Sequence, residues 1–161
     1  SAGKAIYMSI KISDDYLYGF IEGEGCFYVG IVPSQDTKNG FQVIPFFKVS
    51  QNPKGKVILD FLKKRLDCGY VKPNDKKNSS DKSLAYVVRD IISLKEKVIP
   101  FFEEKLFIKR EEFLKFKKII DLMSDKKHLT AQGFREIIDI AYTMNTGNRK
   151  IPKEQLIEHI K

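Results

Sequence analysis

The sequence predicts an α+β domain in which helices gather on one side of an antiparallel sheet. Two patterns in the 161 residues carry this prediction. Apolar side chains alternate with other side chains in two pairs of short segments, which is the period of half-buried strands, and a polar turn joins each pair. Between and after these pairs, apolar residues recur every three or four positions, which is the period of amphipathic helices.

The first expected helix ends at about Glu24. Ser13 is a suitable N-cap, and Asp14 and Asp15 place acidic side chains in the first turn, where the helix dipole favours them. The apolar run Tyr16–Ile21 then forms the body of the helix. We expect this helix to open the folded part of the chain.

A β-hairpin is expected next, from strands at residues 27–34 and 41–50 that are joined by a turn at 36–40. Phe27 and Val29 begin the inward face of the first strand, and the residues between them begin its outward face. The second strand repeats the same alternation.

A second helix and a second hairpin follow. Asn52 and Pro53 open a helix whose apolar spacing continues to Leu66. The hairpin pairs residues 70–74 with residues 83–91 across a polar loop that bears several lysines. This hairpin completes the expected sheet.

The rest of the chain is expected to be helical. Helical spacing occurs at residues 93–104, 109–123 and 130–144, and Pro152 opens a short final helix. The helices therefore follow the strands in the second half of the chain, as in an α+β fold.

One domain is expected, over residues 13–147, because the chain has an ordinary domain length and no internal repeat. Residues 1–12 are expected to form an N-terminal tail. Residues 148–161 are expected to form a C-terminal extension.

The chain is basic, with a formal net charge of +8 and a pI of about 9.3. Such a surface suits nucleic acid, an anionic membrane or simple solubility, and charge alone does not choose among them. No stretch reaches the roughly 18 apolar residues of a membrane span, and no signal peptide is apparent, so a soluble intracellular protein without a membrane partner is expected. The isolated Cys26, Cys68, His128 and His159 argue against a disulfide framework and a structural zinc site.

Glu22 and Glu24 occupy an unfavourable place for acidic side chains, at the expected C-terminal end of the first helix. The helix dipole disfavours an anion there by roughly 0.3–1 kcal/mol. A compensating positive charge is therefore expected, and a hard divalent cation with oxygen ligands is the first candidate.

Gly19 and Gly23 are four residues apart, so they share one face of the helix and leave it without side chains. Glycine costs about 1 kcal/mol relative to alanine inside a helix, which favours a reason such as the close approach of a second helix. If that helix came from another copy of the chain, the Glu24 carboxylates would meet at a symmetry axis and create a site for several metal ions.

The residues from Leu17 to Gly25, which read LYGFIEGEG, resemble the motif that names the LAGLIDADG homing endonucleases. The departures from that motif are Tyr18 for the first Ala, Phe20 for the second Leu, Glu22 and Glu24 for both Asp residues, and Gly23 for the second Ala. Further segments resemble one repeat of the two-motif members: Gly23–Phe27, Gly69–Val71, Lys126–Thr130 and Gly133. The likeness covers about residues 16–147.

This resemblance implies an αββαββα unit with a curved, four-stranded antiparallel sheet and helices packed on its convex face. It also implies that the motif helices of two units pack together, which in this chain assigns Leu17, Gly19, Phe20 and Gly23 to a dimer interface. The chain is then a single-motif, homodimeric member, or an isolated C-terminal-like repeat of a two-motif member.

The resemblance further implies a metal-dependent active site at the end of the motif helix. Glu24, with Gly23, is expected to hold the catalytic Mg²⁺, for which Mn²⁺ or Ca²⁺ substitutes in binding. Gln51 resembles the residue that orders the attacking water, and Lys109 resembles the active-site lysine, which would stabilise charge on the phosphate. Glu22 is expected to be structural and to steady the helix end.

The sheet is expected to read double-stranded DNA, because a concave antiparallel sheet can enter the major groove. The candidate DNA-binding residues are the outward positions of the strands and the lysines of the loops: Tyr28, Gly30, Val32, Ser34, Lys38, Gln42, Ile44, Phe46, Lys48, Lys72, Asn74, Lys76, Lys77, Ser83, Ala85, Val87 and Arg89. The loop lysines are expected to touch phosphates, which position a protein without specifying sequence.

The expected activity is hydrolysis of phosphodiester bonds in both strands of a long, near-palindromic DNA site, as in the homing of mobile introns. By resemblance alone, the place of action is an organelle such as the mitochondrion or plastid. Other functions stay open: an RNA-splicing maturase, a non-cleaving DNA-binding protein of the same fold, and a structural or protein-interaction domain with a basic surface.

Overall fold

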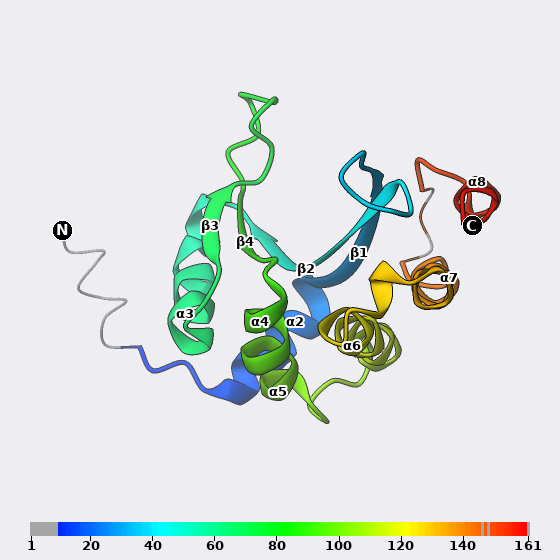
Figure 1. Ribbon diagram of the computed structural model, residues 1–161. Helices are drawn as coiled ribbons and strands as arrows, with labels where there is room; N and C mark the ends of the chain where they lie inside the picture. Colours follow the sequence, from blue (N-terminus) through cyan, green and yellow to red (C-terminus); the bar gives the residue numbers. More distant parts are fainter. Residues whose placement is uncertain (1–9, 146, 148, 161) are drawn as a thin grey trace.

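Four antiparallel strands form one curved sheet, in the order β1-β2-β4-β3, in a computed structural model that describes residues 10–145, 147 and 149–160 (Figure 1). The strands are β1 (Gly25–Pro33), β2 (Phe41–Gln51), β3 (Tyr70–Pro73) and β4 (Leu84–Val88). Both hairpins therefore occur where alternation predicted them, and the sheet is antiparallel throughout.

Helices cover the convex face of this sheet, and the concave face is left open between the two hairpin loops (Figure 1). The α-helices are α2 (Asp14–Glu24), α3 (Lys56–Leu66), α4 (Ile91–Ser93), α5 (Ile99–Phe102), α6 (Arg110–Ser124), α7 (Ala131–Ala141) and α8 (Lys153–Glu158). A π-helical turn at Leu94–Val98 joins α4 to α5, and 3₁₀ turns lie at Pro53–Gly55 and Lys127–Leu129. The predicted α+β fold, with helices on the convex face, is confirmed.

Aromatic side chains fill the core between the sheet and the helices. The ring of Phe27 on β1 stacks on Phe47 of β2, with 5.2 Å between centroids, and meets Phe102 and Phe113 edge-on at 5.8 and 5.5 Å. All of these rings are buried, and burying one such ring contributes roughly 1.5–3 kcal/mol. The inward face of the sheet thus fixes the orientation of its outward face.

The fourth strand is shorter than predicted, because β4 ends at Val88 and residue 91 already begins α4. The cause is Asp90, whose carboxylate accepts a hydrogen bond from the backbone N–H of Ser93 at 2.8 Å and caps the helix. The apolar character of Ile91 suggested a strand, but the cap determines the local conformation.

The predicted C-terminal extension packs against the rest of the domain over its described residues. Leu156 of α8 is fully buried within the main hydrophobic core. The Tyr142 hydroxyl donates to the carbonyl of Ile151 at 2.6 Å, and Lys153 pairs with Asp139 of α7 at 2.8 Å. The predicted N-terminal tail lies largely outside the described residues.

Considering the described ranges only, none of the helices has both the length and the apolar character needed to cross a membrane.

Candidate active site and nucleic-acid interface

Helix α2 turns one side to the core and leaves the other bare. Ser13 caps it by accepting a hydrogen bond from the N–H of Tyr16 at 3.1 Å, as predicted. Leu17 and Ile21 face the core, whereas Gly19 and Gly23 are exposed, and a Cβ atom built on either glycine would meet nothing within 4 Å. The bare face is therefore open to close approach by another helix.

The expectation that Leu17 lies in a dimer interface is wrong, because this side chain is only 2% exposed within the core of its own domain. Leu17 and Ile21 are four residues apart and pack inward together. Phe20 is half-buried and packs against the same core at its margin. Tyr16, which is exposed and three residues before Gly19, joins the open face in place of Leu17.

Glu22 holds the start of α6 against the end of α2. Its carboxylate accepts hydrogen bonds from the backbone N–H groups of Phe107 and of Lys109, the latter at 3.1 Å. Lys109 is the N-cap residue of α6, so its N–H lies at the positive end of the helix dipole, which attracts an anion, whereas Phe107 belongs to the turn that leads into the helix. Glu22 is unfavourably placed at the C-terminal end of α2, but hydrogen bonds from the start of α6 compensate for this. This agrees with its expected structural role.

Glu24 is the exposed last residue of α2, and the chain enters β1 without a linker. Gly25 permits this junction, since a Cβ atom there would lie 2.6 Å from Cγ2 and 2.9 Å from the carbonyl oxygen of Ile21. Gly25 of β1 pairs with Val49 of β2, and Gln51 is the last residue of β2. The sheet register therefore brings Glu24 and Gln51 to one end of the β1–β2 ribbon.

Lys109 belongs to the same neighbourhood as the end of α2. Burial raises the pKa of the Cys26 thiol, and the nearby ammonium groups of Lys109 and Lys48 partly oppose that rise. Cys26 follows Gly25 directly and pairs with Lys48 across the strands. Two lysines of this chain therefore lie near Cys26, two residues after Glu24, whereas the sequence favoured a divalent cation as the compensating charge.

The side chain of Gln51 packs against the backbone of Gly55, in the turn that follows β2. A Cβ atom on Gly55 would lie 2.5 Å from Oε1 and 2.8 Å from Cβ of Gln51, so this glycine makes room for the glutamine. Asn52 caps the turn that contains Gly55 by accepting a hydrogen bond from its N–H at 3.1 Å. The side chain of Gln51, the residue predicted to order water, therefore packs closely against the capped turn that follows β2.

The described part of the chain offers no group of three or more His, Cys, Asp or Glu side chains that could hold a metal ion. Glu24 is the acidic side chain exposed at the end of the open helix face. A metal ion at this place would need further oxygen ligands from another molecule.

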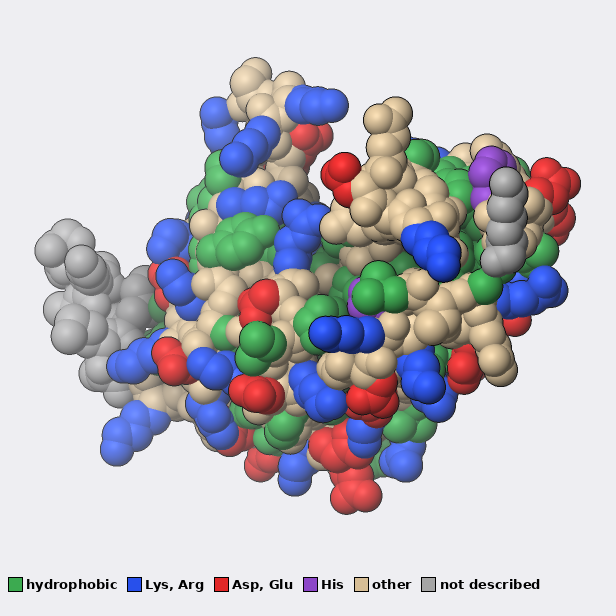
Figure 2. All heavy atoms as spheres, in the orientation of Figure 1, with side chains coloured by type: hydrophobic (Ala, Val, Ile, Leu, Met, Phe, Trp, Pro, Cys, Tyr) green, Lys and Arg blue, Asp and Glu red, His purple; other side chains and the backbone are tan. Residues whose placement is uncertain are grey.

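The outward positions of the strands share the concave face, as predicted. Tyr28 of β1 and Phe46 of β2 are paired across the strands, and their ring centroids lie 5.2 Å apart. Lys48, Lys72 and Asn74 are half-buried on this face, whereas Gln42 and Arg89 are exposed. Figure 2 shows Lys and Arg side chains crowded on the β3–β4 hairpin, from which Lys72, Lys76 and Lys77 come.

Ala85 and Val87 were expected to be exposed for DNA contact, and that expectation is wrong, because they are 0% and 4% exposed. Both lie on the outward face of β4, the strand between β2 and β3. Ala85 pairs with Ser50 and Lys72, and Val87 pairs with Lys48 and Tyr70. Their short side chains lie in the interior of the sheet with a strand on each side, whereas Lys48, Lys72 and Tyr70 beside them stay at least partly exposed.

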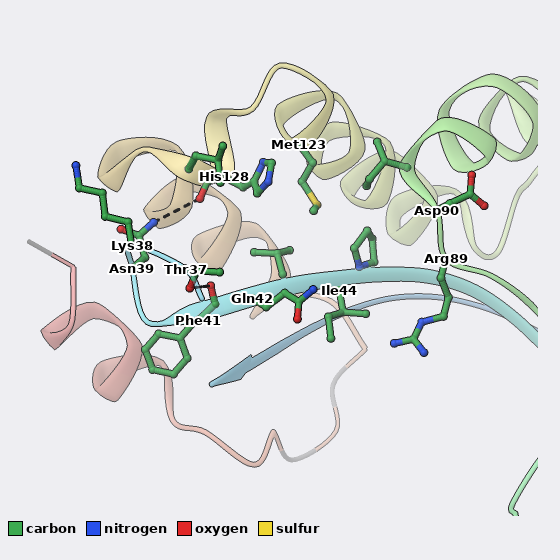
Figure 3. A pocket seen from close by; sticks show the side chains of 14 residues that line it. Thr37, Lys38, Asn39, Phe41, Gln42, Ile44, Arg89, Asp90, Met123 and His128 are labelled. Carbon is green, nitrogen blue, oxygen red and sulfur yellow. Dashed lines mark hydrogen bonds between the residues drawn. The ribbon is translucent and has the colours of Figure 1, made fainter. Parts of the chain in front are cut away.

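A hollow of about 800 Å³ beside β2 was not predicted (Figure 3). It forms because β4 pairs only with residues 47–51 of β2 and leaves the first half of that strand without a partner on this side. Arg89, Met123 and His128 line it opposite the strand. Burial lowers the pKa of His128, whose Nδ1 atom lacks a hydrogen-bond partner within the described residues. The gap depends on long-range pairing, so no local sequence signal reveals it.

Comparison with known proteins gives consistent matches. The family model described as "LAGLIDADG endonuclease" matches residues 17–120. A relative from Neurospora crassa, called "Probable intron-encoded endonuclease 2", is 32% identical over 147 residues, which make up 89% of this chain and 31% of the relative. The chain spans about a quarter to a third of the length of this relative and the two that follow it in similarity.

Solved structures match over nearly the whole chain. The homing endonuclease I-TnaI has a TM-score of 0.83 and 36% identity, with 94% of this chain and 100% of that chain covered. The archaeal intron-encoded homing endonuclease I-Vdi141I, solved with DNA, has a TM-score of 0.82 and 27% identity, covering 91% and 93% of the chains. I-SmaMI, solved with an uncleaved DNA target and calcium ions, has a TM-score of 0.79 and 29% identity, covering 87% of this chain and 47% of that chain.

Proposed function

Because this chain belongs to the LAGLIDADG endonuclease family, we propose that it is a site-specific, metal-dependent DNA endonuclease that acts as a homodimer. The observation that carries the proposal is the end of α2, where the exposed Glu24 adjoins a helix face left bare by Gly19 and Gly23. Two such faces in contact would bring two Glu24 carboxylates to one axis, below the concave sheets. A symmetric protein of this kind suits a long, nearly palindromic duplex.

The proposed cofactor is Mg²⁺, with Mn²⁺ or Ca²⁺ as substitutes in binding. An ion of this kind is commonly held by one or two carboxylates together with water and substrate phosphates, and a single exposed Glu24 fits that pattern. Glu24, with the backbone of Gly23, would hold the ion, which when bound supplies an activated water and neutralises phosphate charge. The calcium-containing structure of I-SmaMI supports a divalent ion in this family.

The other residues of this neighbourhood have separate tasks in the proposal. Lys109 would stabilise negative charge on the phosphate as the phosphodiester bond breaks. Gln51 would orient the attacking water from the end of β2. Glu22 would act as a positioning residue, since its carboxylate holds the backbone N–H of Lys109 at 3.1 Å.

DNA would lie along the concave face of the sheet. Outward residues such as Tyr28, Gln42 and Lys48 would read base edges in the major groove, while Lys76 and Lys77 on the β3–β4 loop would contact phosphates. The net charge of +8 per chain favours a polyanionic partner. The DNA-bound structures of I-Vdi141I and I-SmaMI support this choice of partner.

The test begins with selection from a randomised duplex library in the presence of Ca²⁺, followed by cleavage of the selected duplex with Mg²⁺. We expect a two-fold-related consensus, cleavage of both strands, and loss of cleavage but retained binding in Glu24→Gln. Selective binding without cleavage by the unaltered chain would instead indicate a non-cleaving DNA-binding protein. Absence of salt-sensitive duplex binding would contradict the proposal and favour a protein-interaction domain.

The biological setting is proposed from the relatives. Several of them are named as intron-encoded proteins, which supports a role in intron homing for this chain. Action in an organelle is proposed on the same basis. Splicing of a precursor RNA by the purified protein, without DNA cleavage, would favour a maturase instead.

A further inference from the structure

The free edge of β1 is covered by side chains from the C-terminal part of the chain. β1 lies at one end of the sheet, so its outer carbonyl groups have no neighbouring strand. The carbonyl of Phe27 accepts a hydrogen bond from Nδ2 of Asn145 at 2.8 Å, and that of Val29 accepts one from Nη1 of Arg149 at 2.7 Å. Nη2 of Arg149 also donates to the carbonyl of Ala141, at the end of α7. Arg149 thus ties a helix end to the sheet edge.

The same guanidinium group touches the face proposed to read DNA. It lies over the rings of Tyr28 and Tyr142, at 5.0 and 4.8 Å from their centroids. Tyr28 in turn contacts the ring of Phe46 on β2, with 5.2 Å between centroids. Phe46, Tyr28, Arg149 and Tyr142 therefore form a continuous row from the middle of the reading face to its rim.

A hollow of about 530 Å³ lies along this row. Its lining combines Tyr28, Ile44 and Phe46 from the strands with Tyr142, Arg149 and Lys150 from the C-terminal part. Lys150 is exposed at the rim, whereas Arg149 is half-buried. One concave surface is thus built from the strands, from Tyr142 after α7, and from Arg149 and Lys150, which the sequence assigned to an extension.

We infer that this C-terminal part belongs to the DNA-recognition surface, with Arg149 positioning Tyr28 and Lys150 contacting the phosphate backbone. Two backbone carbonyls already occupy donors of Arg149, and aromatic rings lie against its guanidinium group, so it orients a neighbour and does not read bases itself. Tyr28 keeps a phenolic hydroxyl that donates or accepts a hydrogen bond. The inference rests on the proposed DNA-binding function.

The main test compares the base preferences of the unaltered chain, Tyr28→Leu and Arg149→Lys by selection with Ca²⁺. Lysine keeps the charge but not the planar group with several fixed donors, so Tyr28 loses its support. We expect both variants to lose discrimination at the same base pairs, by about five- to tenfold, the lower range for one specific base contact. The double variant should lose little more than either single variant at those positions.

Lys150→Gln tests the second part of the inference. It should weaken binding to all sequences alike and lower the slope of log K against log salt by about one. Lys118→Gln removes an equal charge from α6, which packs on the convex face, and should leave the slope unchanged. If Lys150→Gln and Lys118→Gln behaved alike, the contact assigned to Lys150 would be refuted.

The thermal midpoint of each variant is measured first, because Arg149 also braces the sheet edge. If Arg149→Lys fails to fold, Tyr142→Leu replaces it, since that change removes the outer ring of the row and should affect the same base pairs. An unchanged preference profile in a folded variant would overturn the inference while leaving the endonuclease proposal intact. Failure of the unaltered chain to select any duplex would count against the proposed function itself.

Discussion

Replacing Glu22 should separate structural support from chemistry at the end of α2. Its carboxylate accepts two backbone hydrogen bonds, from Phe107 and Lys109. Hydrogen bonds to a charged group are each worth about 1.5–3 kcal/mol when water is excluded. Phe107 is 91% exposed, so water can bind the N–H groups that Glu22 would leave free. The free-energy cost should therefore be that of losing an exposed helix cap. We therefore expect Glu22→Ala to lower the free energy of unfolding by about 1–2 kcal/mol, and Glu22→Gln by less.

The assay is urea unfolding followed by circular dichroism, with cleavage measured on the same samples. For a chain of this length each kcal/mol lowers the thermal midpoint by about 2–4 °C. Cleavage by Glu22→Gln should fall while DNA affinity stays nearly unchanged, because the start of α6 that carries Lys109 is less firmly held.

Glu24→Gln is the matched control, with the same chemical change two residues further along the helix. Glu24 is exposed, so its stability should change by less than about 0.5 kcal/mol, while cleavage is lost. Equal stability losses in Glu22→Gln and Glu24→Gln, or none in Glu22→Ala, would refute the assignment of separate roles.

Three other perturbations follow from the structure. Gly19→Ala should raise the unfolding free energy of the monomer by about 0.5–1 kcal/mol, since its Cβ meets nothing within 4 Å, yet weaken self-association in sedimentation experiments; an unchanged dimer would refute the proposed helix contact. Tyr86→Phe removes a 2.9 Å hydrogen bond to the carbonyl of Cys68 and should cost about 1 kcal/mol at pH 7. Burial raises the pKa of Tyr86, so its neutral form stabilises the fold below the ordinary tyrosine pKa of about 10, and that contribution falls as pH rises further. Between pH 8 and pH 11 the free energy of unfolding should therefore decline less in Tyr86→Phe than in the unaltered chain. Chelation with EDTA should abolish cleavage and leave the thermal midpoint unchanged, because the described residues hold no three-ligand metal cluster on which folding could depend; a lower midpoint would reveal a structural ion.

Much of the fold follows from local patterns in the sequence. Alternation correctly placed Phe27, Val29 and Phe47 on the inward face, since a strand with one buried face needs apolar residues at every second position. Ser13 and Thr130 cap helices as their side chains favour. These features depend on neighbours in the chain, which a single sequence contains.

The orientation of α2 could not be predicted in the same way. Apolar side chains surround this helix at Tyr16, Leu17, Phe20 and Ile21, so its spacing does not tell which side meets the core. The burial of Ala85 and Val87 depends on longer side chains from adjacent strands, which only the sheet order brings together.

The support of the candidate site is equally hidden from the sequence. The partners of Glu22 lie 85 and 87 residues further along the chain, and they bind it through backbone N–H groups, which every residue type except proline carries. The family resemblance named Glu24, Gln51 and Lys109, and the structure brings their elements to one end of the β1–β2 ribbon. Their catalytic roles remain predictions that the cleavage experiments test.

The direct passage from α2 into β1 at Gly25 sets a fixed offset in the proposed enzyme. No hinge separates the carboxylate of Glu24 from the strand that carries Tyr28 and Gly30. A strand advances about 3.3 Å per residue and a DNA strand about 3.4 Å per nucleotide, so alternate outward residues progress by nearly two base pairs. Substitutions along β1 can therefore change which bases are preferred without moving the point of scission relative to them.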